Sequence, residues 1–372
     1  MIARFTEKEW SRRLDCVKNY ILQSLPPVDD FCVSLGGYKT VRIRSWFPDA
    51  RELVRKQLSW IVAEPAASPD ATVWFWKEPS PQNFSERVLE LSEAQDDDWD
   101  SFYYRRATSD CFPCGTIDKS GKWGIHLSSG SEYFYGLSDE IKPGFRLSHW
   151  HHVFFEAFFH IMNGPETSVV HGAAVGVSGK GVLLCARGGM GKSTLTVFSL
   201  LRGFDYVADD NLILSRTGSG LEASPIYSYV SLSPEMYEAM FDDLDGTRFM
   251  GIGSWKGKYL VDVSAFSDRV ARHLPIRAAV FPEIDRNAAA PAVFRCTPQE
   301  KGRTIVQIAH STISQMYKEG FKQDQLDSDF IRKTVAMLSG LDFYRIVLTP
   351  DLGANVACLH NFIENDNQCN TL

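Results

Sequence analysis

The chain has 372 residues and a formal net charge of -7. Its hydrophobic share of 44% and charged share of 23% are those of an ordinary globular protein, and its length favours two domains over one. The acidic balance argues against a protein that coats nucleic acid or an anionic membrane. It does not exclude a local basic cleft for phosphates.

The ends and cysteines of the chain indicate its cellular compartment. The N-terminus alternates charged and apolar residues rather than forming a signal-peptide core, and no apolar run approaches the ~18–20 residues of a membrane span. We expect the eight scattered cysteines to be reduced thiols. A Cys-Phe-Pro-Cys run at 111–114 has the spacing of half a zinc site, but no second pair accompanies it. These features predict a cytoplasmic protein with no membrane or nucleic-acid partner.

The first part of the chain mixes helix and strand patterns. Hydrophobic periodicity predicts helices over 7–25, 51–62 and 149–162, and strands near 32–35, 40–44, 71–76, 102–107, 123–127 and 132–135. We place a domain boundary near residue 166. Residues 1–166 are then expected to form an N-terminal α+β domain, and residues 167–372 an α/β domain.

The second part alternates strands with helices. The predicted strands cover 169–177, 182–185, 206–208, 276–281 and 343–348, and the predicted helices cover 195–202, 311–317, 329–338 and 355–363. The turn Ser-Gly-Lys-Gly at 178–181 suggests a hairpin between the first two strands.

The most informative segment, 186–194, reads Ala-Arg-Gly-Gly-Met-Gly-Lys-Ser-Thr between a predicted strand and a predicted helix. This is the order of a phosphate-binding loop, in which backbone N–H groups and a helix N-terminus hold a polyphosphate. Lys192 can reach the β- and γ-phosphates, and the Ser193 hydroxyl can bind Mg²⁺. Ala186 stands where the first glycine is usual. The predicted nucleotide-binding residues are Gly188, Gly189, Met190, Gly191, Lys192, Ser193 and Thr194.

Two adjacent carboxylates, Asp209 and Asp210, end the strand that follows the loop helix. One helix and one return strand separate them from Lys192, so they can come back beside the loop. Phosphoryl transfer needs one acidic group for Mg²⁺ and one that serves as a base. His171, at the start of the strand before the hairpin, is expected at the same end of the sheet.

These residues together resemble the HPr kinase/phosphorylase family. The similarity rests on His-Gly at 171–172, the hairpin, Gly-Met-Gly-Lys-Ser, and Gly-Phe-Asp-Tyr-Val-Ala-Asp-Asp at 203–210, and it continues weakly to about residue 362. The resemblance implies a P-loop kinase domain related to phosphoenolpyruvate carboxykinase, with ATP and Mg²⁺ as cofactors. It implies that Asp209 is the catalytic base, that His171 and Lys192 are catalytic at the γ-phosphate, and that Ser193 and Asp210 hold the metal.

The expected reaction is transfer of the γ-phosphoryl group to a hydroxyl-bearing acceptor, either a protein or peptide serine or a small molecule. The family's Glu-x-Arg-Gly loop has no clear counterpart, the nearest segment being 251–258, so a kinase without phosphorylase activity is favoured. A nucleotide-gated interaction protein without phosphotransfer, and a small-molecule kinase in a biosynthetic cassette, are the alternatives. The choice of ATP, GTP or pyrophosphate as donor and the presence of a homo-oligomer stay open. The N-terminal domain is expected to recognise the acceptor.

Overall fold

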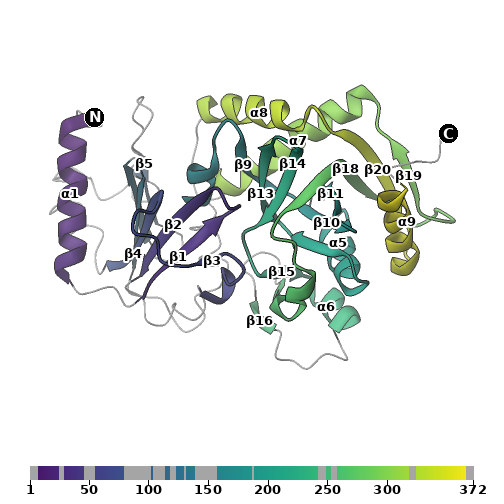
Figure 1. Cartoon of the computed structure of the whole chain (residues 1–372), viewed down its shortest axis with the longest axis horizontal. Coiled ribbons are helices and arrows are strands. Elements are labelled where there is room, and N and C mark those ends of the chain that lie inside the picture. Colours follow the sequence, from purple (N-terminus) through teal and green to yellow (C-terminus); the bar gives the residue numbers. More distant parts are fainter. Residues whose placement is uncertain are drawn as a thin grey trace. The chain divides into compact units, whose positions relative to one another are not determined.

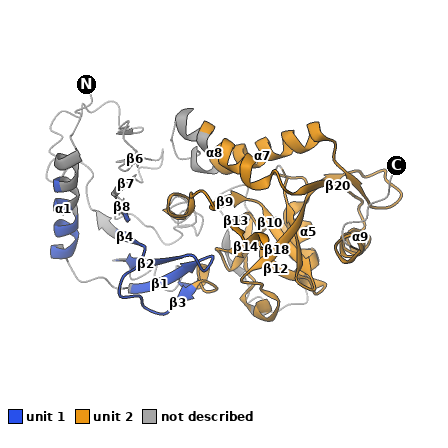
Figure 2. Cartoon of the chain, turned by 45° about the horizontal axis from the view of Figure 1, so that its top comes forward, with its two compact units in different colours: residues 1–55, 62–145, 318–321 blue, residues 56–61, 146–317, 322–372 orange. Residues whose placement is uncertain are grey.

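The computed structural model describes residues 7–24, 29–45, 55–78, 102–103, 114–117, 123–129, 131–138, 157–186, 188–241, 249–252, 258–317 and 324–365. The chain forms two compact units (Figure 2). Unit 1 comprises residues 1–55, 62–145 and 318–321, and unit 2 comprises residues 56–61, 146–317 and 322–372. None of the helices in the described ranges is long and apolar enough to cross a membrane.

Unit 1 is an α+β unit built on a mixed sheet. The order of its eight described strands is β3-β1-β2-β4-β8-β7-β6-β5, and only the β2–β4 and β4–β8 pairs are parallel. Its elements are α1 (Glu7–Ser24), β1 (Asp29–Leu35), β2 (Lys39–Ser45), β3 (Val62–Ala63), β4 (Ala71–Glu78), β5 (Phe102–Tyr103), β6 (Cys114–Ile117), β7 (Trp123–Ser129) and β8 (Glu132–Ser138).

The strands of unit 2 form a larger sheet and a small one. In the described part of the chain the large sheet runs β12-β10-β11-β18-β14-β13-β9, with β20 and β19 continuing from β18. Its strands are β9 (Thr167–His171), β10 (Ala173–Val177), β11 (Lys180–Leu184), β12 (Asp205–Ala208), β13 (Asn211–Thr217), β14 (Gly220–Pro225), β18 (Leu274–Ile284), β19 (Ala292–Arg295) and β20 (Asp342–Leu348). The small sheet pairs β17 (Tyr259–Asp262) with β15 (Tyr229–Leu232) and β16 (Phe249–Ile252).

Helices cover unit 2 (Figure 1). They are α5 (Lys192–Leu201), α6 (Pro234–Phe241), the 3₁₀ helix η3 (Ser264–Arg269), α7 (Pro298–Tyr317), α8 (Asp324–Leu338) and α9 (Leu352–Glu364). Neighbouring residues of one strand enter different cores. Val182 and Leu184 of β11 pack in a core with α5 and α9, whereas Leu183 packs in a second core with α7 and α8. Each of these fully buried side chains contributes about 1.5–3 kcal/mol, so β11 is a firm support for the loop that follows it.

The predicted hairpin is confirmed. β10 and β11 pair antiparallel with Val177 opposite Lys180. The two turn residues Ser178 and Gly179 have φ of 52° and 75°. Positive φ at both central residues is the geometry that matches the twist of hairpin strands. The hairpin brings Ala173 opposite Leu184, so the end of β11 and the start of β10 lie side by side.

Two sequence expectations differ from the structure. The strand expected over 169–177 is two strands, because the chain leaves one end of the large sheet at Gly172 and joins the other. The helix expected over 51–62 is helical at 55–57, after which the chain turns and Val62 enters β3.

The helical residues 157–162 pack in unit 2, with the ring of Phe159 4.9 Å from that of Phe330 in α8. The domain boundary near residue 166 stays a prediction.

A short piece of the N-terminal sequence also belongs to unit 2. Segment 56–61 inserts Trp60 into the core beside α5, where its ring centroid lies 5.8 Å from that of Tyr206. The backbone N–H of Ser228 donates to the carbonyl of Gln57 at 2.9 Å. Edge-to-face aromatic packing and a backbone hydrogen bond hold this segment against β12 and the residue that precedes β15.

Candidate active site

The loop between β11 and α5 has the backbone of an anion cradle. Gly189 and Gly191 have φ of 88° and 87°, a left-handed conformation that side chains other than glycine adopt only with strain. A Cβ on Gly189 would meet nothing within 4 Å, so the loop is open above this residue. α5 begins directly at Lys192, and no side chain caps its N-terminus. The first N–H groups of the helix therefore need partners, and an anion can supply them.

Lys192 is buried at the first position of α5 and points to the carboxylates. Its Nζ donates to Asp209 Oδ1 at 3.0 Å and to Asp210 Oδ1 at 3.1 Å. Only 7% of its side chain is exposed. Removing a charged group from water is costly, so such a group is buried only where partners compensate its charge. The two carboxylates compensate Lys192. The expected return of the carboxylates beside the loop is thus confirmed, while the catalytic roles stay predictions.

The two carboxylates occupy different environments. The Asp209 side chain is 0% exposed and that of Asp210 is 30% exposed. Among the described residues, no donor reaches the buried Oδ2 of Asp209. Asp210 has a φ of 73°, which is uncommon for a residue other than glycine and typical of functional sites. The backbone therefore turns one carboxylate inward and the next toward solvent.

The site lies where the chain twice crosses between the two opposite sides of the strand order in the large sheet. One crossing joins β9 to β10 at Gly172, and the other joins β12 to β13 at Asp209 and Asp210. The crossings lie side by side, because the N–H of Gly172 donates to the carbonyl of Asp210 at 3.0 Å. His171 pairs in register with Asn211, which places it next to the carboxylates. Its own backbone N–H donates to Thr312 Oγ1 of α7 at 2.8 Å.

Neighbouring charges fix the protonation states of Asp210 and Lys192. Burial alone would raise the pKa of Asp210, but Lys192, His171 and Lys258 together hold it well below its ordinary value. Burial alone would lower the pKa of Lys192, but Asp209 and Asp210 raise it above its ordinary value. Both groups are therefore charged at neutral pH.

The side chains fit a metal only as part of a metal–phosphate complex. Within the described ranges, no three His, Cys, Asp or Glu side chains come together as a metal site. Mg²⁺ that binds with substrate phosphates needs one or two carboxylates and keeps several waters. The partly exposed Asp210 meets that need, and Ser193, the second residue of α5, stands one position from Lys192.

Some neighbours of the site carry no sequence signal. Tyr206 and Tyr229 are buried, and Asp210 lies near enough to raise the pKa of both phenols beyond the increase that burial causes. Lys258 helps to lower the pKa of Asp210, whereas Arg277 is exposed on β18. A tyrosine three positions before Asp209 in a strand looks like ordinary core, so the sequence could not single it out.

The loop, the buried lysine and the paired carboxylates can now be compared with known proteins. No family model matches the chain. The chain is 46% identical over 55 residues to HPr kinase/phosphorylase of Bordetella pertussis, a match that covers 15% of this chain and 18% of the relative. Proteins of the same name from Bordetella parapertussis and Bordetella bronchiseptica match to the same extent. Over these 55 residues the chain is similar to HPr kinase/phosphorylases.

This finding confirms the family resemblance expected from the sequence, over a limited stretch. The match spans less than a fifth of the length of these curated relatives, 18% in each case. A solved structure described as the Hpr(Ser) kinase/phosphatase from Coxiella burnetii aligns with 54% of this chain and 99% of its own, at 13% identity and a TM-score of 0.30. The fold of the chain is mixed α/β, as its sheets and helices show.

Proposed function

We propose that this chain is a kinase that transfers the γ-phosphoryl group of ATP to a hydroxyl group. The observation that carries the proposal is the position of the Lys192 ammonium, at an uncapped helix N-terminus and 3.0 Å and 3.1 Å from two carboxylate oxygens. A cation for phosphates and acidic groups for a metal and a proton are what phosphoryl transfer requires. The similarity to HPr kinase/phosphorylases supports the same reaction class.

The phosphate-binding part of the proposal assigns the loop from Gly188 to Thr194 to the polyphosphate. The N–H groups at the start of α5 and the positive end of its dipole hold phosphate oxygens. Lys192 gives up one carboxylate partner and contacts the β- and γ-phosphates instead. That exchange keeps the buried ammonium compensated, since one anion replaces another.

The proton-transfer part assigns the base to Asp209. The acceptor oxygen attacks the γ-phosphorus, the bond from phosphorus to the β-phosphate oxygen breaks, and ADP leaves. The acceptor proton passes to the carboxylate of Asp209, whose buried Oδ2 has no donor among the described residues. We assign to His171, which pairs with Asn211 next to Asp210, a contact with the transferring group.

The metal part assigns Mg²⁺ to Ser193 and Asp210. These two residues would hold the ion with the phosphates, and the ion would supply positive charge that offsets the phosphate oxygens. Asp210 suits this role better than Asp209, because its partly exposed carboxylate leaves space for the waters that Mg²⁺ retains.

We further propose that the acceptor is a serine of a protein or peptide or the hydroxyl of a small molecule, and that residues 1–166 recognise it. The catalytic domain is then 167–372, a P-loop kinase domain of the phosphoenolpyruvate carboxykinase type. The reaction runs without a phosphorylase activity, because the sequence has no clear Glu-x-Arg-Gly loop; most of the nearest segment, 251–258, lies outside the described residues.

The test is transfer of label from γ-labelled ATP. Purified protein is incubated with Mg²⁺, labelled ATP and cell extract, separated into protein and small-molecule fractions. Label that moves to either fraction, and fails to move with Lys192→Ala, supports the kinase and identifies the acceptor class. ATP binding without any transfer would instead favour the nucleotide-gated interaction protein.

A further inference from the structure

A buried hydroxyl of α7 holds the backbone of His171. The N–H of His171 donates to Thr312 Oγ1 at 2.8 Å, and the hydroxyl of Thr312 donates to the carbonyl of Ile308, one turn earlier in α7, at 2.9 Å. Thr312 is 0% exposed. A threonine hydroxyl has one hydrogen and two lone pairs. Because its hydrogen is committed to Ile308, the hydroxyl of Thr312 serves His171 as an acceptor.

This bond takes the place of a neighbouring strand. β9 is the last strand in the described order of the large sheet, and it pairs with β13. α7 lies against β9 (Figure 1). The N–H of His171 therefore meets a side chain of α7 where a further strand would supply a carbonyl. A substitution that removes the hydroxyl leaves this N–H without that partner, which is costly inside a packed structure.

α7 is itself firmly held, so the hydroxyl of Thr312 is a fixed reference point. Nζ of Lys301, in the first turn of α7, donates to the carbonyls of Ser339 and Leu341 at 2.7 Å each. Ile308 is buried in one core with Leu338 of α8. Close packing of this kind resists displacement. The position of His171 is therefore tied to a rigid part of unit 2.

The residue that Thr312 holds lies at the candidate active site. The next N–H along the chain, that of Gly172, donates to the carbonyl of Asp210 at 3.0 Å. Two consecutive N–H groups thus tie the crossing at 171–172 to α7 and to the turn that carries the carboxylates. His171 is also near enough to Asp210 to help lower its pKa. A displacement of the His171 backbone would therefore move the imidazole relative to that carboxylate.

A second buried threonine shows that filling space in a helix does not require such a bond. Thr334 of α8 is 1% exposed, and its Oγ1 has no hydrogen-bond partner among the described residues. Valine resembles threonine in shape and differs in lacking the hydroxyl. The hydroxyl of Thr312, unlike that of Thr334, therefore has a defined task at the backbone of His171.

Resting on the proposed kinase function, we propose that Thr312 is a positioning residue for phosphoryl transfer, whose hydroxyl sets the place of His171 through its backbone N–H. Thr312 acts through His171 and contacts neither the nucleotide nor the acceptor. A misplacement of about 1 Å at a reacting centre can cost about a hundredfold in rate. The loss of the hydroxyl should therefore slow transfer, whereas ATP binding on the loop before α5 should persist.

The test replaces Thr312 in the full chain and measures two properties: the rate of label transfer from saturating γ-labelled ATP to cell extract, and the Kd of Mg²⁺-loaded ATP by calorimetry. For Thr312→Val we expect transfer about 10–100-fold slower and a Kd within about threefold of wild type. Thr312→Ser keeps the hydroxyl and should restore transfer to within about threefold. Thr334→Val is the matched control and should leave both properties unchanged.

Two further measurements separate positioning from general damage. In a His171→Ala background, Thr312→Val should slow transfer by less than about twofold, since residues that act as a unit are not additive. Hydrogen exchange of the His171 amide, followed by NMR, should be slow in the wild type, Thr312→Ser and Thr334→Val, and faster in Thr312→Val. If Thr312→Val does not fold, Thr312→Ala removes the same hydroxyl and carries the same expectations.

Three results would overturn the role of Thr312: wild-type transfer in the folded valine or alanine variant, a serine variant as slow as the valine variant, or a full additional loss in the His171→Ala background. A wild-type chain that transfers no label rejects the kinase and this role with it. A wild-type chain that transfers label at a rate unaffected by Thr312→Val rejects the role of Thr312 alone.

Discussion

Two short ion pairs, one from each unit of this chain, differ sharply in their exposure to solvent. In unit 1 the ion pairs lie at the surface: Arg42 grips Asp30 at 2.7 Å and 2.8 Å, with about a third of each side chain exposed, 34% and 30%. In unit 2, Lys192 and Asp209 form a pair of similar length whose side chains are 7% and 0% exposed. Short contacts thus occur in both units, but only one pair has been removed from water.

This difference in solvent exposure distinguishes an ordinary surface ion pair from one that suggests a functional site. A solvated ion pair contributes about 0–1 kcal/mol and needs no explanation beyond the surface it occupies. A buried pair must overcome the desolvation of both ions, and an apolar pair of the same volume would often be at least as stable. Retaining the charges next to an uncapped helix N-terminus therefore points to chemistry rather than stability. The following variants test this contrast, from the largest expected effect to the smallest.

Replacing Lys192 should have the largest effect. Lys192→Ala removes the cation that compensates charge on the transferring group, so we expect phosphoryl transfer to fall by about 10³–10⁵-fold. ATP binding should also weaken greatly, as measured by calorimetry. Lys180→Ala, at the start of β11, is the matched control and should keep both properties. Near-normal transfer in Lys192→Ala would remove the basis of the kinase proposal.

Asp209→Asn should abolish transfer while preserving nucleotide binding. The amide keeps the size of the side chain but cannot take the acceptor proton, which costs about 10²–10⁴-fold in rate. The measurements are single-turnover transfer of label and the Kd of ATP, which should change only a few-fold. Full turnover in this variant would show that the base assignment is wrong.

Asp210→Asn should lower the free energy of unfolding by about 1–3 kcal/mol at neutral pH, because the charged hydrogen bond to Lys192 is lost. The pKa of Asp210 is lowered in the folded chain, so its contribution is complete above the ordinary value of about 3.9 and is lost as the pH falls through the lowered pKa. Urea unfolding at pH 7, 5 and 3 should therefore show equal differences from wild type at the first two values and a smaller one at the third.

The exposed Asp268 provides the control for that series, since Asp268→Asn should change stability little at any pH. A difference for Asp210→Asn that instead grew as the pH fell would contradict the sign of the shift.

The smallest effect is expected in unit 1. Asp30→Ala breaks the contacts with both Arg42 and Arg44, yet we expect a loss of less than about 1 kcal/mol, since all three side chains are partly solvated. Urea unfolding at low and high salt measures it, and the loss should shrink in high salt. A loss as large as that of the buried site would remove the contrast between the units.

Much of unit 2 could be predicted from local patterns. The hairpin turn at Ser178-Gly179 and the glycine loop are fixed by short-range chemistry, and the helices ending at Tyr317 and Leu338 end where predicted. Their predicted starts, at 311 and 329, were wrong, because α7 begins at Pro298 and α8 at Asp324. The convergence of Lys192 with the carboxylates also followed, because one helix and one strand must return the chain to the same edge.

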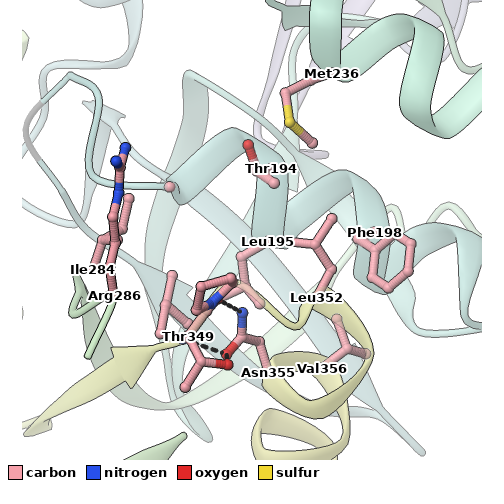
Figure 3. Close-up of a pocket in the computed structure, with 13 residues that line it drawn as sticks. Thr194, Leu195, Phe198, Met236, Ile284, Arg286, Thr349, Leu352, Asn355 and Val356 are labelled. Atoms are coloured by element: carbon pink, nitrogen blue, oxygen red, sulfur yellow. Dashed lines mark hydrogen bonds between the residues drawn. The ribbon is translucent and has the colours of Figure 1, made fainter. Parts of the chain in front are cut away.

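Other features had no local signal. Gly172 sits in a mostly apolar run, and only the order of the strands shows that the chain crosses to the other end of the sheet there. The sequence predicts that segment 56–61 is part of a helix over 51–62. Only the tertiary structure shows that Trp60 packs in the core with Tyr206. A pocket beside the start of α5 is lined by Gly191, Met236 and Asn355, which come from elements widely separated in sequence (Figure 3). No sequence spacing could therefore have predicted it.

The sequence by itself determined the glycine-rich loop, the identity of the charged residues and the alternation of strands and helices, since these depend on neighbours a few positions apart. Only the tertiary structure decided which carboxylate is buried and which faces water, and which apolar side chains enclose the pocket. Those properties depend on the exclusion of solvent by segments distant along the chain, and burial of that kind is a property of the packed molecule rather than of any stretch of it.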